Sequence, residues 1–421
     1  MSEPIQTSEK SGECNFFKDT EIGTIPKDWE VARVGDCFTL GRGRVISKSD
    51  LRENPGIYPV YSSQTTNFGE MGAISTFDFE GEYITWTTDG ANAGTVYYRS
   101  GKFNCTNVCG TLKAKSEFQV DLRFVAHYLS TVAKNHVSYV GNPKLMNGVF
   151  AEILFCFPSL NEQEKIADIL SSVDDVIENT QTQINKLSDL KTATMNELLT
   201  KGIGHTEFKE TEIGLIPTTW EIKALHECAE VISSPVDKKS KSNETAVKLC
   251  NYMDVYSNRE IYKSLEFMEA TAKDREIEKF QLFKDDLIVT KDSEDPTDIG
   301  VPALVVEDIE GLVCGYHLAI IRTINQVLYP KFALYLFMHE FVKKQLYLKA
   351  NGSTRFGLGV GELQETLILL PSFLEQEKIA DILTSLDEQI EVVELKLLQL
   401  ESLKKSLMQD LLTGKVRVKA A

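Results

Sequence analysis

The 421 residues carry a formal net charge of −17, and 42% of them are hydrophobic. At about 150 residues per domain, this length predicts two to four domains. The charge excludes a protein that coats nucleic acid without sequence preference, because such binding depends on many Lys and Arg contacts to phosphates. The polar N-terminal region and the lack of a long apolar run indicate neither a signal peptide nor a membrane span. Eight cysteines without metal-ligand spacing favour a reduced, cytoplasmic protein without a metal site.

Two segments of the sequence occur twice. FKDTEIGTIPKDWE begins at Phe17 and returns as FKETEIGLIPTTWE at Phe208, an offset of 208 − 17 = 191 residues. PSLNEQEKIADIL begins at Pro158 and returns as PSFLEQEKIADIL at Pro371, an offset of 371 − 158 = 213 residues. The stretches between these motifs share little sequence. Because the divergence is confined to these inserts, the sequence predicts a common frame that carries two domains with different targets.

Apolar residues recur in two columns, seven positions apart, after each EQEKIADIL motif. Such sustained heptads without an internal Pro or Gly predict long helices packed as a coiled coil. About 40 residues at 1.5 Å per residue make each helix roughly 60 Å long. The two helices of one chain can satisfy each other, and a homodimeric coiled coil is the alternative. Lys191 and Lys404 stand at equivalent seam positions (404 − 191 = 213). The residues expected to pair the helices are Ile166, Leu170, Val173, Ile177, Ile184, Leu187, Leu198, Ile379, Leu383, Leu386, Ile390, Val393, Leu397, Leu400, Leu407 and Leu411.

The order of the motifs along the chain is nearly circular. The chain ends just after the second helix, at the point where the FK(D/E)TEIG motif would recur, and that motif instead opens the protein. We therefore expect the two termini to lie close together.

Each insert has the pattern of a small α+β domain. Segments 81–103 and 283–305 each predict a strand, a polar glycine-containing loop and a second strand. A strand at 315–322 and an apolar helix from about Lys331 to Leu348 complete the second insert, and residues 121–132 are the expected counterpart in the first. The expected fold class is α+β: two α+β domains separated by two long helices packed as an antiparallel coiled coil, with a pseudo-twofold internal repeat.

The combination of these motifs resembles the specificity subunit of a type I restriction–modification system. The resemblance covers residues 17 to about 415. It rests on the paired TEIGxIPxxWE motifs, the paired FPS or LPS with EQEKIADIL, the heptad helices that end in LLT, and the variable inserts between them. The division it implies is a flexible N-terminal segment at 1–16, target-recognition domains at 17–157 and 203–370, long helices at 158–202 and 371–415, and a tail at 416–421.

This resemblance also implies a function and a set of partners. The chain would read an asymmetric bipartite DNA target without catalysing a reaction. Each domain would read about three to five base pairs in the major groove, and the helices would set the spacer between the half-sites. Beside double-stranded DNA, the implied partners are two S-adenosylmethionine-dependent modification subunits, which dock on the helices, and ATP-driven restriction subunits. The chain itself is expected to bind neither cofactor.

Candidate DNA contacts come from residue types that read bases or bind phosphates. Arg, Lys, Asn and Gln read base edges, whereas phosphates are bound by basic side chains, hydroxyls and backbone amides. Neither insert is strongly basic: residues 31–157 hold 11 acidic and 12 basic side chains, and residues 222–370 hold 23 and 18. We therefore expect partner subunits to contribute to DNA affinity. The candidates are Arg42, Arg44, Lys48, Asn92, Lys144, Lys238, Lys239, Lys241, Lys291, Lys344 and Arg355.

Two other classes of protein remain as alternatives. A self-contained adenine methyltransferase would need an Asn-Pro-Pro-aromatic tetrapeptide and a glycine-rich cofactor turn after a strand. The sequences NPGI at Asn54 and NPKL at Asn142 lack the second Pro and the aromatic residue. Asp285 and Asp286 with Lys291 faintly resemble a nuclease core, but carboxylates are common where a strand begins. A coiled-coil scaffold would leave two dissimilar domains without a role.

Overall fold

The computed structural model describes residues 16–418. The flexible segment expected at 1–16, apart from Phe16, lies outside the described residues, and so do the last three residues of the tail expected at 416–421. No helix within the described part of the chain is long and apolar enough to cross a membrane.

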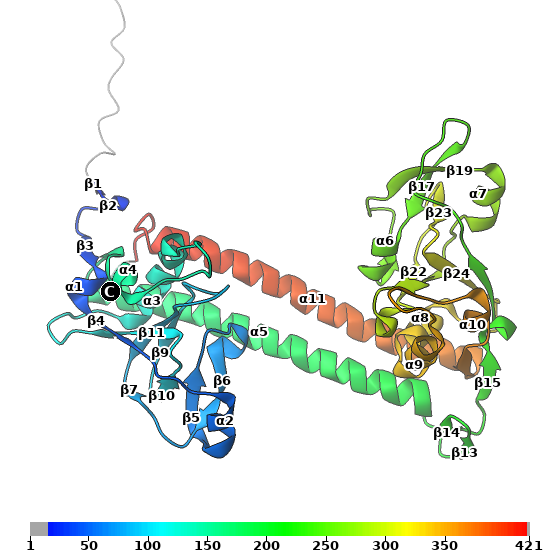
Figure 1. The fold of residues 1–421 in the computed structure, drawn as a ribbon, viewed down its shortest axis with the longest axis horizontal. Helices are drawn as coiled ribbons and strands as arrows, with labels where there is room; N and C mark the ends of the chain where they lie inside the picture. Colours follow the sequence, from blue (N-terminus) through cyan, green and yellow to red (C-terminus); the bar gives the residue numbers. More distant parts are fainter. Residues whose placement is uncertain (1–15, 419–421) are drawn as a thin grey trace, which may run out of the picture. The chain divides into compact units, whose positions relative to one another are not determined.

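The chain divides into two compact units. Unit 1 holds the residues up to 182 and those from 395 onward, and unit 2 holds residues 183–394. Each unit contains one α+β domain and a part of each long helix, α5 (Leu160–Lys201) and α11 (Phe373–Leu411) (Figure 1).

The domain of unit 1 is built on two four-stranded sheets. The first, β4-β11-β8-β9, is antiparallel throughout, and the second, β6-β5-β10-β7, contains the parallel pair β5 and β10. Helix α3 contacts β8 and β9. It begins after Asp121, whose carboxylate accepts hydrogen bonds from the N–H groups of Arg123 and Phe124 and so caps the helix. The elements are β1 (Phe17–Thr20), β2 (Gly23–Pro26), β3 (Glu30–Arg33), α1 (Val34–Cys37), β4 (Phe38–Arg42), α2 (Lys48–Glu53), β5 (Pro55–Tyr61), β6 (Glu70–Ile74), β7 (Phe79–Glu80), β8 (Tyr83–Thr87), β9 (Val96–Arg99), β10 (Lys102–Cys105), β11 (Cys109–Ala114), α3 (Leu122–Val132), α4 (Asn147–Ala151) and β12 (Leu154–Phe157).

The domain of unit 2 has a five-stranded and a three-stranded sheet. The order of the first is β16-β24-β20-β22-β18 and that of the second is β19-β17-β23. Strand β20 (Leu287–Thr290) is buried at every residue, which suits its central position in the larger sheet. The other elements are β13 (Phe208–Thr211), β14 (Gly214–Pro217), β15 (Glu221–Ala224), β16 (Ala229–Ser233), β17 (Thr245–Cys250), α6 (Tyr252–Tyr256), β18 (Glu260–Ile261), β19 (Met268–Ala272), α7 (Asp274–Phe280), β21 (Asp292–Ser293), β22 (Pro302–Val305), β23 (Leu312–Cys314), β24 (Leu318–Thr323), α8 (Pro330–Met338), α9 (Glu340–Lys349), β25 (Phe356–Gly357), α10 (Val360–Gln364) and β26 (Leu367–Leu370).

The prediction of a single apolar helix from Lys331 to Leu348 is wrong in one respect, because the structure has two helices there. Helix α8 ends at Met338, and His339 has extended backbone angles (φ −82°, ψ 144°). The His339 side chain accepts a hydrogen bond from the Phe341 N–H and caps α9. Apolar periodicity continues across this break, so the sequence pattern alone does not reveal it.

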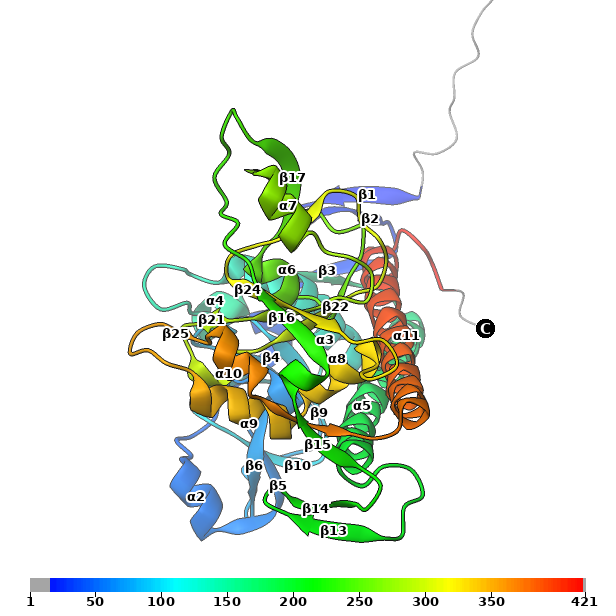
Figure 2. The ribbon, with the colours of Figure 1, turned by 90° about the vertical axis from the view of Figure 1, so that its right-hand side faces the viewer.

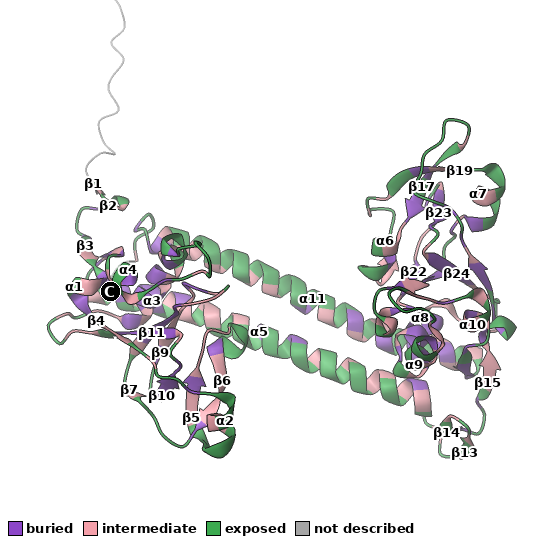
Figure 3. Cartoon of the chain, in the orientation of Figure 1, coloured by how far each residue is buried: buried purple, intermediate pink, exposed green. Residues whose placement is uncertain are grey.

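The long helices pair as the heptads predict, and Figures 1 and 2 show α5 and α11 side by side. Every residue expected to pair the helices is buried or partly buried (Figure 3). Ile166 and Leu170 also belong to the core of unit 1, and Ile379 and Leu383 to the core of unit 2. The start of each helix is therefore fixed by a recognition domain as well as by the other helix.

Two lysine–aspartate pairs show the antiparallel direction of the helices. Lys191 Nζ lies 2.5 Å from Asp387 Oδ1 in unit 2, and Lys404 Nζ lies 2.5 Å from Asp174 Oδ1 in unit 1. Going from 174 to 191 along α5 thus corresponds to going back from 404 to 387 along α11. The two aspartates are equivalent by the repeat (387 − 174 = 213), so each helix provides the lysine of one pair and the aspartate of the other.

The described ends of the chain lie close together, as the circular order of the motifs predicts. Arg417 binds the carboxylate of Asp28 at 2.7 and 2.9 Å and that of Glu162 at 2.8 Å. Gly414 has a left-handed backbone (φ +68°), and a Cβ atom there would come within 2.4 Å of Pro26. The first copy of the TEIG motif therefore packs against the end of α11.

Candidate nucleic-acid interface

The two domains share one frame of backbone hydrogen bonds despite their different sequences. In unit 1, the Thr88 N–H donates to the Val108 carbonyl and the Leu145 N–H donates to the Thr88 carbonyl, both at 2.9 Å. In unit 2, Lys291 N–H donates to His317 at 3.0 Å, and Leu358 N–H donates to Lys291 at 2.8 Å. Leu145 and Leu358 are equivalent by the repeat (358 − 145 = 213).

This frame brings three loops together in each domain. We call residues 88–95, 105–109 and 138–146 the first cradle, and residues 291–300, 314–318 and 350–359 the second cradle. The hydrogen bonds place Asp89 of the first cradle and Asp292 of the second at equivalent positions. The cradles therefore present different side chains from the same backbone arrangement.

A polar pocket of about 650 Å³ opens beside the first cradle. It contains two of the predicted DNA contacts, Lys48 and Asn92, which are far apart in the sequence. Gln64 and Asn107 line it as well, and sequence analysis missed both. Their only sequence signal is an amide side chain in a turn-rich segment. Amides and lysines are residue types that read bases, so this pocket has suitable chemistry for a DNA contact.

Both predicted arginines of the first domain are held by its own carboxylates. Arg42 Nη2 donates to Asp89 Oδ2 at 3.1 Å and to Thr88 Oγ1 at 3.2 Å, while its Nε donates to the Asn107 carbonyl. Arg44 Nε donates to Asp78 Oδ2 at 2.8 Å. These contacts fix the two side chains and engage part of their hydrogen-bonding capacity.

The loop that contains Lys144 is anchored from both sides. The Lys144 backbone pairs with Ser138 at 2.9 Å in both directions, and its side chain is exposed. Trp86 Nε1 donates to the Leu145 carbonyl at 2.9 Å from inside the core. The neighbouring Tyr139 and Val140 are strongly exposed. This loop therefore offers a basic and an apolar contact on a fixed support.

A buried arginine supports another loop beside the first pocket. Arg99 lies over the rings of Tyr61 and Tyr97, with its guanidinium carbon 3.6 and 4.4 Å from their centres. Its Nη2 donates to the Phe68 carbonyl at 2.5 Å. Burial lowers the pKa of Arg99. Because it is enclosed by the domain, Arg99 supports the loop and is not itself available to DNA.

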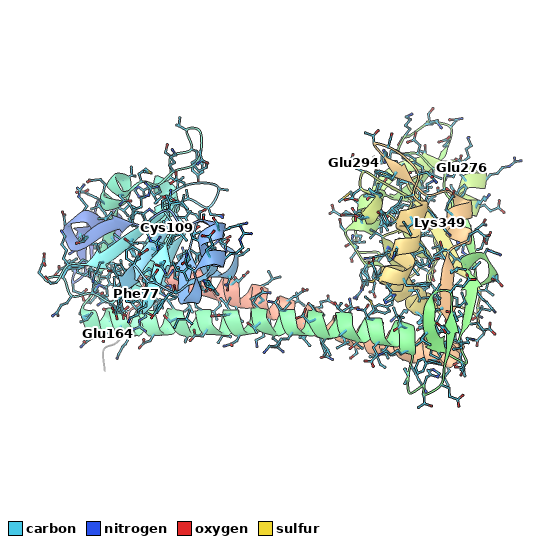
Figure 4. All side chains as sticks on the ribbon, turned by 60° about the horizontal axis from the view of Figure 1, so that its bottom comes forward. Phe77, Cys109, Glu164, Glu276, Glu294 and Lys349 are labelled. Atoms are coloured by element: carbon cyan, nitrogen blue, oxygen red, sulfur yellow. The ribbon has the colours of Figure 1, made fainter. Side chains whose placement is uncertain are left out.

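A pocket of about 430 Å³ lies beside the second cradle and contains the predicted contacts Lys238 and Arg355. Four carboxylates also line it, one of which, Glu294, is labelled in Figure 4. Sequence analysis missed the remaining polar and aromatic lining. This set comprises Tyr252, Asp292, Ser293, Glu294, Asp295, Asp298 and His317.

The other predicted lysines of the second domain are placed differently. Lys291 belongs to the second cradle, but its Nζ donates to Ser233 Oγ at 2.7 Å inside the domain. Lys239 and Lys241, both exposed, form ion pairs with Asp237 and Glu244 at 3.4 and 3.0 Å. The hydrogen bond that Lys241 donates to Glu244 raises the pKa of Lys241. Lys344 is exposed on α9.

Comparison with known proteins follows the two-domain division of the fold. The family described as Type I restriction modification DNA specificity domain matches twice, over residues 26–189 and 217–402. The chain is 28% identical over 421 residues to the MjaVIII specificity subunit of Methanocaldococcus jannaschii, and the alignment covers 96% of each chain. It is 50% identical to a putative type I specificity subunit N-terminus of Mycoplasma pneumoniae over 141 residues, which are 33% of this chain and 75% of the relative. The alignment with the MpnII specificity subunit of the same organism is 49% identical and covers 34% of this chain and 43% of the relative.

Two solved structures have the same fold. The type I restriction–modification S subunit from M. genitalium superimposes with a TM-score of 0.61 at 17% identity, covering 91% of this chain and 96% of that one. A chain from a study of assembly and conformational transition of the type I system gives 0.53 at 14% identity, covering 93% and 99%.

The fold therefore defines a class of protein in which two α+β domains accompany an antiparallel pair of long helices. Because the family matches both halves of the sequence, the chain belongs to the type I restriction–modification DNA specificity family. It is a specificity subunit, and DNA target recognition is its function.

Proposed function

We propose that this subunit reads an asymmetric bipartite DNA target, with one half-site read by each cradle. The observation that carries this proposal is the shared backbone frame with different side chains. The first cradle presents Asn92 and Lys144, whereas the second presents His317 and Arg355. Because base readout depends on the identity of side chains at fixed positions, the two half-sites should differ in sequence.

We further propose that the chain catalyses no reaction, and that S-adenosylmethionine and ATP bind to partner subunits. The sequence supports this, because neither NPGI at Asn54 nor NPKL at Asn142 is a methyltransferase tetrapeptide. Among residues 16–418 no group of three or more His, Cys, Asp or Glu residues is placed to hold a metal ion. The expected location is the cytoplasm, and the free thiols of the described cysteines suit its reducing conditions.

The proposed protein partners are two modification subunits, which dock on the helices, and the restriction subunits of the same system. Exposed apolar side chains on both helices support docking there. They include Val176 and Leu190 on α5 and Val392, Leu395 and Leu398 on α11. Apolar side chains in water gain free energy when a partner covers them.

The target should appear in the methylome of cells that express this chain together with the modification subunit of its own system. We expect long-read sequencing to show an asymmetric bipartite adenine-methylation motif only when both proteins are present. Cells that express either protein alone are the controls. Methylation by this chain alone would contradict the non-catalytic role, and no motif with both proteins would contradict the proposed target recognition.

The length of the helix pair should set the spacer of the motif. Deleting residues 177–183 from α5 removes about 10 Å of helix, and the two Lys–Asp pairs can then no longer form together. We expect this single deletion to abolish or re-space the methylated motif. Deleting residues 390–396 from α11 as well makes the separation of the two pairs equal again, at 191 − 174 − 7 = 10 positions on α5 and 404 − 387 − 7 = 10 on α11, and should give the same half-sites with a new spacer. An unchanged motif and spacer in the single deletion would contradict this role of the helices.

A further inference from the structure

Arg355 lies at an exposed loop of the second cradle that is tied to the domain at its base. The strand β25 (Phe356–Gly357) that follows it pairs with β21 (Asp292–Ser293), and Asn351 exchanges backbone hydrogen bonds with Gly357 at 2.9 and 3.0 Å. The backbone around Arg355 is therefore fixed while its side chain is open to solvent.

A histidine and an aspartate hold the Arg355 guanidinium from one side. Nη2 of Arg355 lies 3.2 Å from Nδ1 and 3.4 Å from Nε2 of His317. His317 Nδ1 lies 2.7 Å from Asp292 Oδ2. A carboxylate only accepts hydrogen bonds, so the His317 Nδ1–H donates to Asp292 Oδ2. Nη2 of Arg355 is almost equally far from the two ring nitrogens, so the guanidinium lies against the face of the His317 ring. Asp292 thus orients His317, and His317 orients Arg355.

The outer edge of the Arg355 guanidinium is open. A guanidinium group has five N–H donors, and within residues 16–418 only Nη2 of Arg355 makes a hydrogen bond. The second N–H of Nη2 and an N–H of a neighbouring nitrogen form a planar fork on that edge. Guanine presents two acceptors, N7 and O6, in the major groove, and such a fork matches them.

The surroundings of Arg355 favour a base over a phosphate. The pocket that it lines also contains Asp292, Glu294, Asp295 and Asp298. These carboxylates repel a phosphate, whereas a neutral base edge meets no such repulsion. Exposed Lys344 on α9 does not line this acidic pocket.

The equivalent position in the first domain shows the opposite arrangement. Val108 stands where His317 stands, and Asp89 binds Arg42 directly. Nε and Nη2 of Arg42 are both engaged with groups of its own domain. Unlike Arg42, Arg355 therefore combines a fixed position with an unoccupied fork.

We propose that Arg355 reads a guanine in the half-site of the second domain, and that Asp292 and His317 position it for this contact. This proposal rests on the proposed function, since it assumes that the second cradle meets DNA. It names one base of the target and one side chain that selects it. It also distinguishes a specificity-determining arginine from the other basic candidates.

The test compares R355K with wild type in the full chain combined with its modification subunit. Lysine keeps the charge and loses the planar fork. We expect the methylated motif of R355K to become degenerate at one guanine of the second half-site, with the first half-site unchanged. In competition binding to duplexes altered at that position, wild type should discriminate roughly 10- to 100-fold and R355K close to not at all. R275K, an exposed arginine on α7, is the matched control and should leave the motif unchanged.

Different outcomes separate this proposal from the proposed function. A phosphate contact would leave the R355K motif intact, and R355A would weaken binding equally for all sequences and lower the salt dependence by about one unit. That result, or a second half-site without guanine, overturns the assignment of Arg355 alone. A wild-type complex that methylates no bipartite motif overturns the proposed function as well.

The positioning roles of Asp292 and His317 have their own readout. D292N should relax the same base as R355K, and the double variant D292N/R355K should relax it no further than R355K does. A purely structural role would instead lower methylation at every position and reduce thermal stability. That uniform loss would overturn the positioning role.

Discussion

D387A should lower the free energy of unfolding of unit 2 by about 3 kcal/mol, because the substitution breaks the contact between the long helices and the domain. A loss of this size is usual when one partner of a buried ion pair is removed. The Asp387 side chain is 7% exposed and accepts from Lys191 Nζ at 2.5 Å, from Tyr335 Oη at 2.8 Å and from Arg259. Alanine would leave two cations partly enclosed without a counter-charge. Hydrogen exchange of peptides from α8 and α11, together with thermal unfolding, measures the loss.

The repeat supplies a matched control for this substitution. Asp174 is the equivalent residue of α5 and pairs with Lys404 at 2.5 Å, but its side chain is 37% exposed. Because solvent screens the pair, D174A should cost less than about 1 kcal/mol. Equal losses for D387A and D174A would show that burial does not govern the strength of these pairs.

G110A should destabilise the first domain by about 3 kcal/mol, at the upper end of the usual cost of overpacking. A Cβ atom at Gly110 would lie 2.2–2.4 Å from three ring atoms of Trp86. The ring cannot move aside easily, because it stacks on Phe150 at 4.1 Å and its Nε1 donates to the Leu145 carbonyl. Leu145 belongs to the first cradle, so DNA recognition by the first domain should weaken together with stability.

G148A is the control for G110A in the same domain. A Cβ atom at Gly148 would meet nothing within 4 Å, and the residue lies in α4. We expect G148A to be neutral or to stabilise by up to about 1 kcal/mol, because alanine favours helix. Thermal unfolding of both variants and the methylated motif in cells give the comparison. A G110A protein as stable as G148A would contradict the packing argument.

The long helices could be predicted because their evidence is local and repeated. A seven-residue period survives many substitutions, and the same seam positions recur 213 residues later. The partner of Lys191 could not be predicted, because a heptad pattern does not say which residue of another helix faces a given position. The break at His339 was missed for a related reason, because a single extended residue leaves the apolar spacing intact.

The cradles could not be predicted from sequence, because backbone hydrogen bonds define them. Thr88 and Lys291 occupy the same place in the frame and share no chemistry. Residue type alone selected Lys48 and Asn92, which line one pocket, and Arg355, which lines another. It could not reveal that Lys291 is directed to Ser233. Whether each candidate contacts DNA remains a prediction.

The reciprocal Lys–Asp pairs also restrict which helix assemblies can form. In a parallel alignment that matched the two repeats, Lys191 would face Lys404 and Asp174 would face Asp387, so both positions would hold like charges. A parallel dimer of two copies of α5 or of α11 would meet the same repulsion. Charged residues thus replace some apolar contact between the helices and disfavour pairing with wrong partners. The same repulsion disfavours parallel self-association of the first helix before the second helix has been synthesised.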